Sequence, residues 1–191
     1  KFFLRIAFYT YLSDILTKFP YNMNPLIVGS YISVAGFAGL VASPVVGWLI
    51  DNIGKRVTAF FGGLLLFTTF SMYFLIDWVS YLYILIMMMG FSITMMFITF
   101  STIVVDINPR LRSTYSSVYN ALRFLGYSLG PSLMLPVYHA YGFPGVLIFC
   151  VAMTFIVLAV VSTKFVSSEI LQEAGIRPVQ SEYFIKNINE D

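Results

Sequence analysis

The sequence has few charged residues. Its 191 residues include 11 Lys or Arg and 9 Asp or Glu, so 10% are charged, whereas soluble domains average about 25%. A soluble domain of this length needs charge to cover its surface, so the shortage argues against a soluble enzyme. The net charge of +2 is scattered along the chain rather than clustered, and we therefore expect no nucleic-acid partner.

Cysteine and histidine are equally scarce, which limits the chemistry of the chain. The one cysteine, Cys150, cannot form a disulfide within the chain, and it lies in an apolar run where a thiol packs as a small hydrophobic group. The one histidine, His139, belongs to no clustered set of His, Cys or acidic residues. We therefore expect neither a metal site nor a cofactor.

The sequence has long apolar runs instead. Hydrophobic residues make up 59% of the chain, and charge-free runs cover residues 19–50, 57–76, 78–105 and 124–163. Each run reaches the roughly 20 residues that cross a bilayer core. The last run holds parts of two crossings, because prolines and glycines between Pro136 and Gly145 predict a turn within it. Backbone groups in lipid cannot bond to water, so spans of this length must be helical.

These runs predict an all-α membrane protein with six transmembrane helices. The expected helices cover about residues 2–17, 25–50, 57–76, 80–105, 113–138 and 144–166. They form a transmembrane unit over residues 1–166, which a polar tail follows over residues 167–191. Because the first residue is Lys rather than Met, and the first apolar segment begins at once with Arg5 inside it, we expect the chain to be a fragment.

The distribution of Lys and Arg predicts the orientation. Alternate connections carry Lys55 and Arg56, then Arg110 and Arg112, and the tail has further basic residues, whereas the opposite side has only Lys18. Basic residues accumulate on the cytoplasmic side of membrane proteins. We expect a multi-pass protein of the cytoplasmic membrane with both termini in the cytoplasm.

Small residues recur on one face of the second predicted helix. Their four-residue spacing permits close helix packing in a membrane, and they are Ala35, Gly39, Ser43 and Gly47. The fifth predicted helix repeats this four-residue spacing with Gly126 and Gly130. In both helices a proline follows a small residue: Pro44 follows Ser43, and Pro131 follows Gly130. The likeness favours two inverted repeats of three helices each. The alternative is that transmembrane helices commonly gather Gly and Pro.

The connection after the second predicted helix carries a specific motif. Residues 47–56 read Gly-Trp-Leu-Ile-Asp-Asn-Ile-Gly-Lys-Arg, with an acid near the helix end, a glycine able to take positive φ, and two bases. The pattern Gly-x-Leu-x-Asp-x-x-Gly-Lys-Arg resembles the signature between the second and third helices of each half in the major facilitator superfamily of transporters. Asn52 stands where that family often has Arg. The resemblance implies a part in conformational gating for Gly47, Asp51, Gly54, Lys55 and Arg56.

A second stretch extends the resemblance over almost the whole chain. This stretch is similar to the family's entry into its fifth or eleventh helix. Its residues are Asp106 and Arg112, followed by Asn120, Arg123, Gly126, Gly130 and Pro131. The family has twelve helices in two halves, so the resemblance implies that this chain is one half. The N-terminal half usually carries Arg-x-x-Gln-Gly in its fourth helix, but here Ile86 and Met89 precede Gly90 at that spacing. This difference favours the C-terminal half.

The resemblance implies secondary active transport of a small solute, such as a drug-like or other organic compound, by alternating access. The implied partners are a small-molecule substrate, the lipid bilayer, and a missing N-terminal six-helix half or a second six-helix chain. The alternative is a six-helix membrane scaffold or self-assembling subunit without transport of its own. An enzyme is not expected. Residues 126–130 match a hydrolase nucleophile elbow, but they lie inside an apolar helix, and His139 is about 16 Å away along it.

Three polar residues are candidates for contact with a substrate or coupling ion. Arg123 lies about ten residues into the fifth predicted helix, near the bilayer midplane. A charge there costs about 2.5–3.5 kcal/mol and should face protein or a water-filled interior. Arg123 either contacts substrate or a coupling carboxylate, or forms a structural hydrogen bond with helix carbonyls. Asn120 precedes it on the same helix, and Asp14, at the outer end of the first helix, is a candidate for ion coupling.

Overall fold

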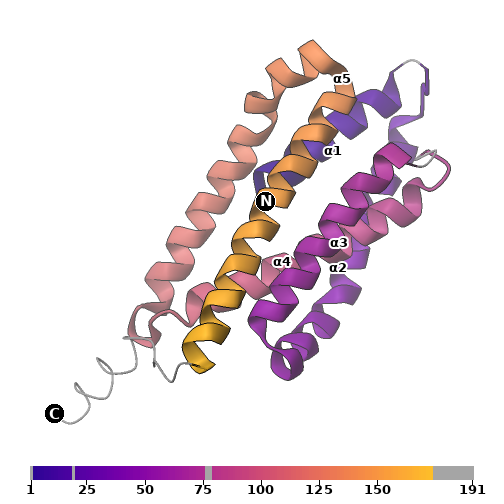
Figure 1. Cartoon of the computed structure of the whole chain (residues 1–191). Helices are drawn as coiled ribbons and strands as arrows, with labels where there is room; N and C mark the ends of the chain where they lie inside the picture. Colours follow the sequence, from indigo (N-terminus) through magenta and orange to yellow (C-terminus); the bar gives the residue numbers. More distant parts are fainter. Residues whose placement is uncertain (1, 19, 76–78, 174–191) are drawn as a thin grey trace, which may run out of the picture.

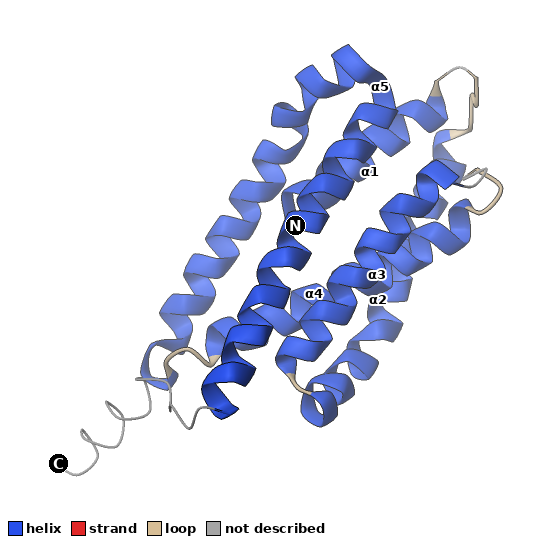
Figure 2. Ribbon diagram, in the orientation of Figure 1, coloured by secondary structure: helices blue, strands red, loops and turns tan. Residues whose placement is uncertain are grey.

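The computed structural model of the chain describes residues 2–18, 20–75 and 79–173. Within these ranges the regular structure is helical throughout (Figure 2). The elements are α1 (Phe2–Thr17), α2 (Pro25–Ile53), α3 (Lys55–Leu75), α4 (Leu82–Val105), a short 3₁₀ helix η1 (Pro109–Leu111) and α5 (Arg112–Glu173). The predicted polar tail falls outside the described residues from residue 174 onward.

Helix α5 consists of two arms that meet at Gly142. This residue has φ 65° and ψ −161°, which interrupts the helix, and Figure 1 shows the chain reversing its direction there. Glycine lacks a Cβ and therefore takes this conformation without strain. The sequence predicted a turn over residues 139–143, but the helical conformation continues to Tyr141 and resumes at Phe143. The turn is shorter than predicted because one glycine suffices to make it.

The helices run up and down, so their ends gather at two ends of the bundle. In Figure 1 the α2–α3 connection, the start of α5 and the described end of α5 lie at one end. The α1–α2 connection, the start of α4 and the turn at Gly142 lie at the other. Helix α2 packs mainly on α4, α1 mainly on α5, and α3 on both α4 and α5. Residues distant in sequence, such as those of α1 and α5, are therefore neighbours.

In the described part of the chain, four helices are long and apolar enough to cross a membrane: α2, α3, α4 and α5. Helix α1 has 16 residues, fewer than the roughly 20 that cross a bilayer core. The all-helical membrane architecture agrees with the prediction from the sequence. The count of six crossings and the division into two repeats remain predictions.

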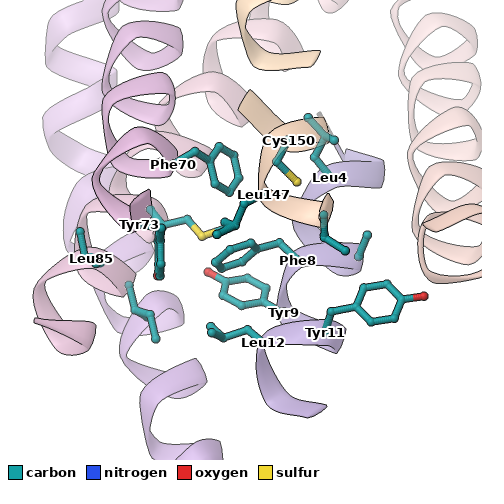
Figure 3. Packing of buried hydrophobic residues seen from close by; sticks show 14 of the residues in the cluster. Leu4, Phe8, Tyr9, Tyr11, Leu12, Phe70, Tyr73, Leu85, Leu147 and Cys150 are labelled. Carbon is teal, nitrogen blue, oxygen red and sulfur yellow. The ribbon is translucent and has the colours of Figure 1, made fainter. Parts of the chain in front are cut away.

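The core is formed by apolar and aromatic side chains between α1, α3, α4 and α5 (Figure 3). Phe8 is fully buried, and its ring centroid lies 5.3 Å from that of Phe70 and 5.2 Å from that of Tyr73. Phe143, directly after the α5 turn, lies 5.8 Å from the same ring. Cys150 is buried in this cluster as a packing residue. The cluster anchors the second arm of α5 to α1 and α3.

Small residues bring α2 and α4 into close contact. A Cβ added to Gly90 would meet the carbonyl oxygen of Ala35 and lie 2.8 Å from its Cα, and one added to Gly39 would lie 2.6 Å from Thr94 Oγ1. Further along the stripe, Ser43 is exposed and Gly47 has open space where its Cβ would be. The close approach is therefore confined to the first half of the stripe.

Candidate functional site

The connection between α2 and α3 is closed by Gly54. Its φ of 96° and ψ of 155° form a backbone conformation that residues with a Cβ rarely adopt. The Gly54 N–H donates a 3.1 Å hydrogen bond to the carbonyl oxygen of Ile50, and α3 begins at the next residue. Asp51 and Arg56 are both exposed on either side of this tight turn.

An ion pair joins this connection to the end of α4. Lys55 Nζ donates a hydrogen bond to Oδ2 of Asp106, which lies 51 residues further along the chain and caps the C-terminus of α4. This hydrogen bond holds the pKa of the Asp106 carboxyl below its ordinary value, and the positive charge of Arg112 acts in the same direction. The structure thus brings together two connections that the sequence singled out separately.

The pair is exposed, since the Lys55 and Asp106 side chains are 39% and 42% accessible, and exposed ion pairs contribute little to stability. A carboxyl with a lowered pKa stabilises the fold above its ordinary pKa, and this contribution is lost only as the pH falls through the lowered value. The pair is therefore formed at physiological pH. In the described ranges, neither Asp51 nor Arg56 belongs to an ion pair.

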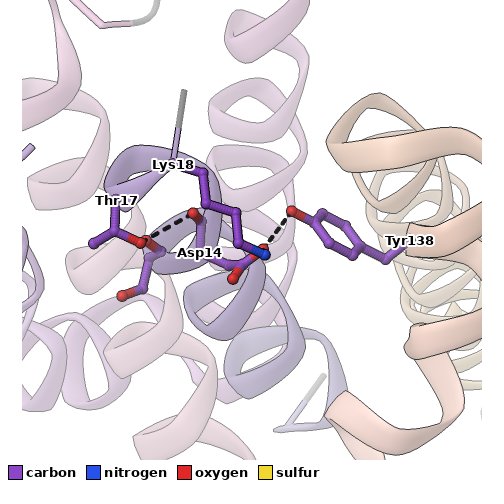
Figure 4. Close-up of polar contacts among 5 residues, drawn as sticks. Asp14, Thr17, Lys18 and Tyr138 are labelled. Atoms are coloured by element: carbon purple, nitrogen blue, oxygen red, sulfur yellow. Dashed lines mark hydrogen bonds and ion pairs between the residues drawn. The ribbon is translucent and has the colours of Figure 1, made fainter. Parts of the chain in front are cut away.

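Asp14 lies where α1 meets the first arm of α5 (Figure 4). Its Oδ2 accepts a 2.8 Å hydrogen bond from Lys18 Nζ and a 2.6 Å hydrogen bond from the Tyr138 hydroxyl. The Tyr138 ring stacks on Tyr11 with centroids 4.4 Å apart, and the Tyr11 hydroxyl donates a 2.6 Å bond to the carbonyl oxygen of Pro131. Asp14 therefore belongs to a polar link between two helices.

Arg123 lies on the first arm of α5 against aromatic rings. Its guanidinium carbon is 5.0 Å from the ring centroid of Phe97 on α4, and 4.9 Å and 6.0 Å from those of Phe124 and Tyr127. A cation over such rings is attracted by their negative faces. Asn120 and Gly126 are both half-buried on the same arm.

A cavity of about 350 Å³ lies between α1, α2 and α4. Its polar wall includes Arg5 and Tyr9 of α1, and Phe97, whose ring contacts Arg123, also lines it. Helix α2 contributes small residues, among them Gly36, Gly39 and Ser43. Arg5 is absent from the candidates predicted from the sequence, although a charge inside an apolar segment is the same signal that singles out Arg123.

Two other cavities have a different character. One of about 440 Å³ lies between α1 and α5, and one of about 550 Å³ lies between the two arms of α5. Both are lined almost entirely by apolar side chains, such as Phe149 and Val137. Of these three cavities, the one at Arg5 is therefore the best suited to hold a polar solute.

The described residues also bear on two other kinds of site, a hydrolase nucleophile and a metal centre. The Gly126–Gly130 pentad is helical throughout, so Ser128 does not occupy the strained strand-to-helix turn that a nucleophile elbow requires. Across the residues that the structure describes, His, Cys, Asp and Glu side chains form no group of three that could hold a metal ion.

Comparisons with known proteins identify what the chain resembles. A family model described as Major Facilitator Superfamily matches residues 2–181. The uncharacterized MFS-type transporter YwfA from Bacillus subtilis (strain 168) is 31% identical over 153 residues, which cover 76% of this chain and 34% of that protein. The chain thus spans about a third of the length of this relative. No solved structure matches.

Proposed function

Because the chain belongs to the major facilitator superfamily, we propose that it is one half of a secondary active transporter that moves a small solute by alternating access. The family match and the MFS-type transporter relative support transport in general. The chain covers about a third of that relative, which supports a unit that works together with further transmembrane segments. The proposal contains no enzymatic step.

We propose six crossings, formed by α1 to α4 and the two arms of α5. The apolar part of α5 is 52 residues long, far more than the roughly 20 that one crossing needs, and it reverses at Gly142. The proposed orientation puts the α2–α3 connection, the start of α5 and both termini in the cytoplasm, in a multi-pass protein of the cytoplasmic membrane. The motif differences at Ile86 and Met89 lead us to propose the C-terminal half.

The helix contacts support two repeats of three helices. If α1, α2 and α3 correspond to α4 and the two arms of α5, the α2–α4 contact corresponds to the contact between the first α5 arm and α1. A glycine closes each contact, Gly39 in the first and Gly130 in the second. Inverted repeats of this kind place substrate sites at the interface between them.

The ion pair between Lys55 and Asp106 is the observation on which the gating proposal rests. It links the start of α3 to the end of α4 across two connections that we place on one side of the membrane. An exposed pair can break without the cost of burying an uncompensated charge. We propose that it closes the cytoplasmic side in one conformation and separates in the other.

Charge reversal tests this gate in the complete transporter reconstituted into proteoliposomes, with uptake of a panel of small organic solutes as the readout. Lys55→Asp and Asp106→Lys should each slow uptake by roughly tenfold, a usual size for coupling between sites. The double reversal should restore most of the rate because it remakes the pair. Arg110→Asp is the matched control, since Arg110 is exposed and lies outside the ion pairs of the described residues.

Three outcomes contradict the proposal at different levels. Single reversals that leave uptake unchanged would remove the gate while leaving transport in place. Uptake by the 191-residue chain alone would contradict the proposed half-transporter. A complete protein that folds and inserts but moves no solute would favour a membrane scaffold instead.

A further inference from the structure

Arg5 carries a positive charge into the apolar body of α1. Its Nε atom is buried and has no hydrogen-bond partner. The contact recorded for its guanidinium is with the ring of Tyr9, 6.0 Å from the centroid. Arg5 as a whole is half-buried, and because arginine stays charged in proteins, the withdrawal of part of its guanidinium from solvent is costly unless a partner compensates the charge. This site therefore calls for a negatively charged group.

The same cavity holds a second unsatisfied donor. Tyr9 follows Arg5 by one helical turn, is 8% exposed, and its buried hydroxyl has no hydrogen-bond partner. Both side chains line the cavity between α1, α2 and α4. Leaving either group unpaired is unfavourable, so this wall of the cavity offers two donors to an acceptor bound there.

The acids whose side chains the structure describes do not supply that acceptor. Asp14 already accepts hydrogen bonds from Lys18 and Tyr138. Asp106 is paired with Lys55. Asp51 is exposed at the end of α2. Arg123 adds further positive potential, because its guanidinium contacts the ring of Phe97, which lines the cavity. The described residues that line the cavity thus include a positive charge and no acid.

The rest of the lining limits what the anion can be. Leu40, Ile93 and Phe97 present apolar surface, while Gly36 and Gly39 keep the α2 wall free of bulky side chains. The volume of about 350 Å³ suits a small molecule. The planar guanidinium of arginine matches a carboxylate through two parallel hydrogen bonds.

We propose that this cavity binds a small organic carboxylate, with the carboxylate on Arg5 and Tyr9 and the apolar body against Leu40, Ile93 and Phe97. The inference rests on the proposed transport function, whose substrate class it names. A carboxylate from a protein segment outside this chain is the other possible source of the same chemistry, and the experiment below separates the two.

The experiment compares carboxylates with their uncharged amides on the complete transporter in detergent. The probes are acetate with acetamide, benzoate with benzamide, and cinnamate with cinnamamide, each titrated while the melting temperature is recorded. At least one carboxylate should bind and raise the melting temperature, and its amide should not. Equal behaviour within all three pairs would overturn the proposal.

Variants connect that preference to the cavity. Arg5→Gln should weaken carboxylate binding on the order of a hundredfold, and Tyr9→Phe about tenfold, since each removes a hydrogen bond to a charged group. Lys18→Gln is the matched control that should keep the preference, because this side chain does not line the cavity. An unchanged preference in Arg5→Gln would overturn the assignment.

Folding and uptake separate the remaining explanations. If substrate supplies the anion, Arg5→Gln should insert and fold as well as the parent protein, because it removes an uncompensated charge. If a protein carboxylate pairs with Arg5, the same variant should lose folded yield, and added carboxylates should not stabilise the parent, which overturns the proposal. Carboxylate binding without uptake would support this inference and contradict the proposed transport function. Uptake that Arg5→Gln leaves unchanged would support transport and contradict this inference.

Discussion

Two helix contacts in this molecule are both closed by glycine and yet are held together differently. Between α2 and α4, the backbones approach so closely that a Cβ on Gly90 would meet the Ala35 backbone. Between α1 and α5, Gly130 also faces backbone, with its added Cβ 2.8 Å from the carbonyl oxygen of Phe3. The second contact has, in addition, the hydrogen bonds of Tyr11 and Tyr138.

The difference indicates which contact tolerates change. Lipid offers helices no hydrophobic reason to associate, so packing and hydrogen bonds hold them together. Both glycines face backbone, which cannot move aside for an added methyl group as a side chain can, but the shorter approach at Gly90 makes the α2–α4 contact the stricter one. The α1–α5 contact distributes its stability over several separable links.

The largest effect is expected for Gly90→Ala. The new methyl group would overlap the Ala35 backbone, and overpacking of this kind costs about 1–3 kcal/mol or more in free energy of unfolding. Gly29→Ala is the matched control, because it lies in a helix with nothing within 4 Å of the added Cβ. Folded yield and melting temperature of the detergent-solubilised protein measure both. Equal stability of the two variants would remove the strict contact from the comparison.

A smaller loss is expected for Gly130→Ala. Its added Cβ would meet the Phe3 carbonyl oxygen at 2.8 Å, a less severe overlap than the one at Gly90, and the Tyr11 and Tyr138 bonds would still join the helices. The cost should lie toward the lower end of the same range of about 1–3 kcal/mol. The same melting measurement checks it. A loss larger than that of Gly90→Ala would reverse the order of the two contacts.

The smallest effect is expected for Tyr138→Phe. The variant keeps the ring that stacks on Tyr11 and loses only the hydrogen bond to Asp14, so it should cost about 0.6 kcal/mol. Tyr141→Phe is the control, since that side chain is 74% exposed. A double-mutant cycle with Asp14→Asn should show coupling between the two positions. Strictly additive losses would mean that the hydrogen bond contributes nothing.

Charge and apolar patterning predicted the helical membrane architecture because they are local signals that lipid enforces. The partners of individual residues could not be predicted in this way. The spacing of Ala35 and Gly39 indicates a close contact, but Gly90, which completes it, stands alone in its own helix. Lys55 and Asp106 belong to separate motifs, and only the packing of α3 on α4 brings them together.

The candidate cavity shows the same limit. Arg123 is a candidate because it lies deep in an apolar helix, but it does not line the cavity. Arg5 does line it, yet it stands close to the start of the first apolar segment, where a charge also marks the boundary of a membrane span. The cavity itself combines residues from α1, α2 and α4. The cavity could therefore not be predicted from any single stretch of the sequence.

Because α5 is interrupted at Gly142, a change in the backbone angles of this residue would rotate one helical arm relative to the other about that point. The first arm spans residues 112–141 and is about 45 Å long at 1.5 Å per residue. Each degree of rigid rotation about that point therefore displaces its far end by roughly 0.8 Å. That far end lies beside the end of α4, where Asp106 holds Lys55. A rotation of a few degrees at one glycine thus becomes a displacement comparable to the length of an ion pair at the opposite face.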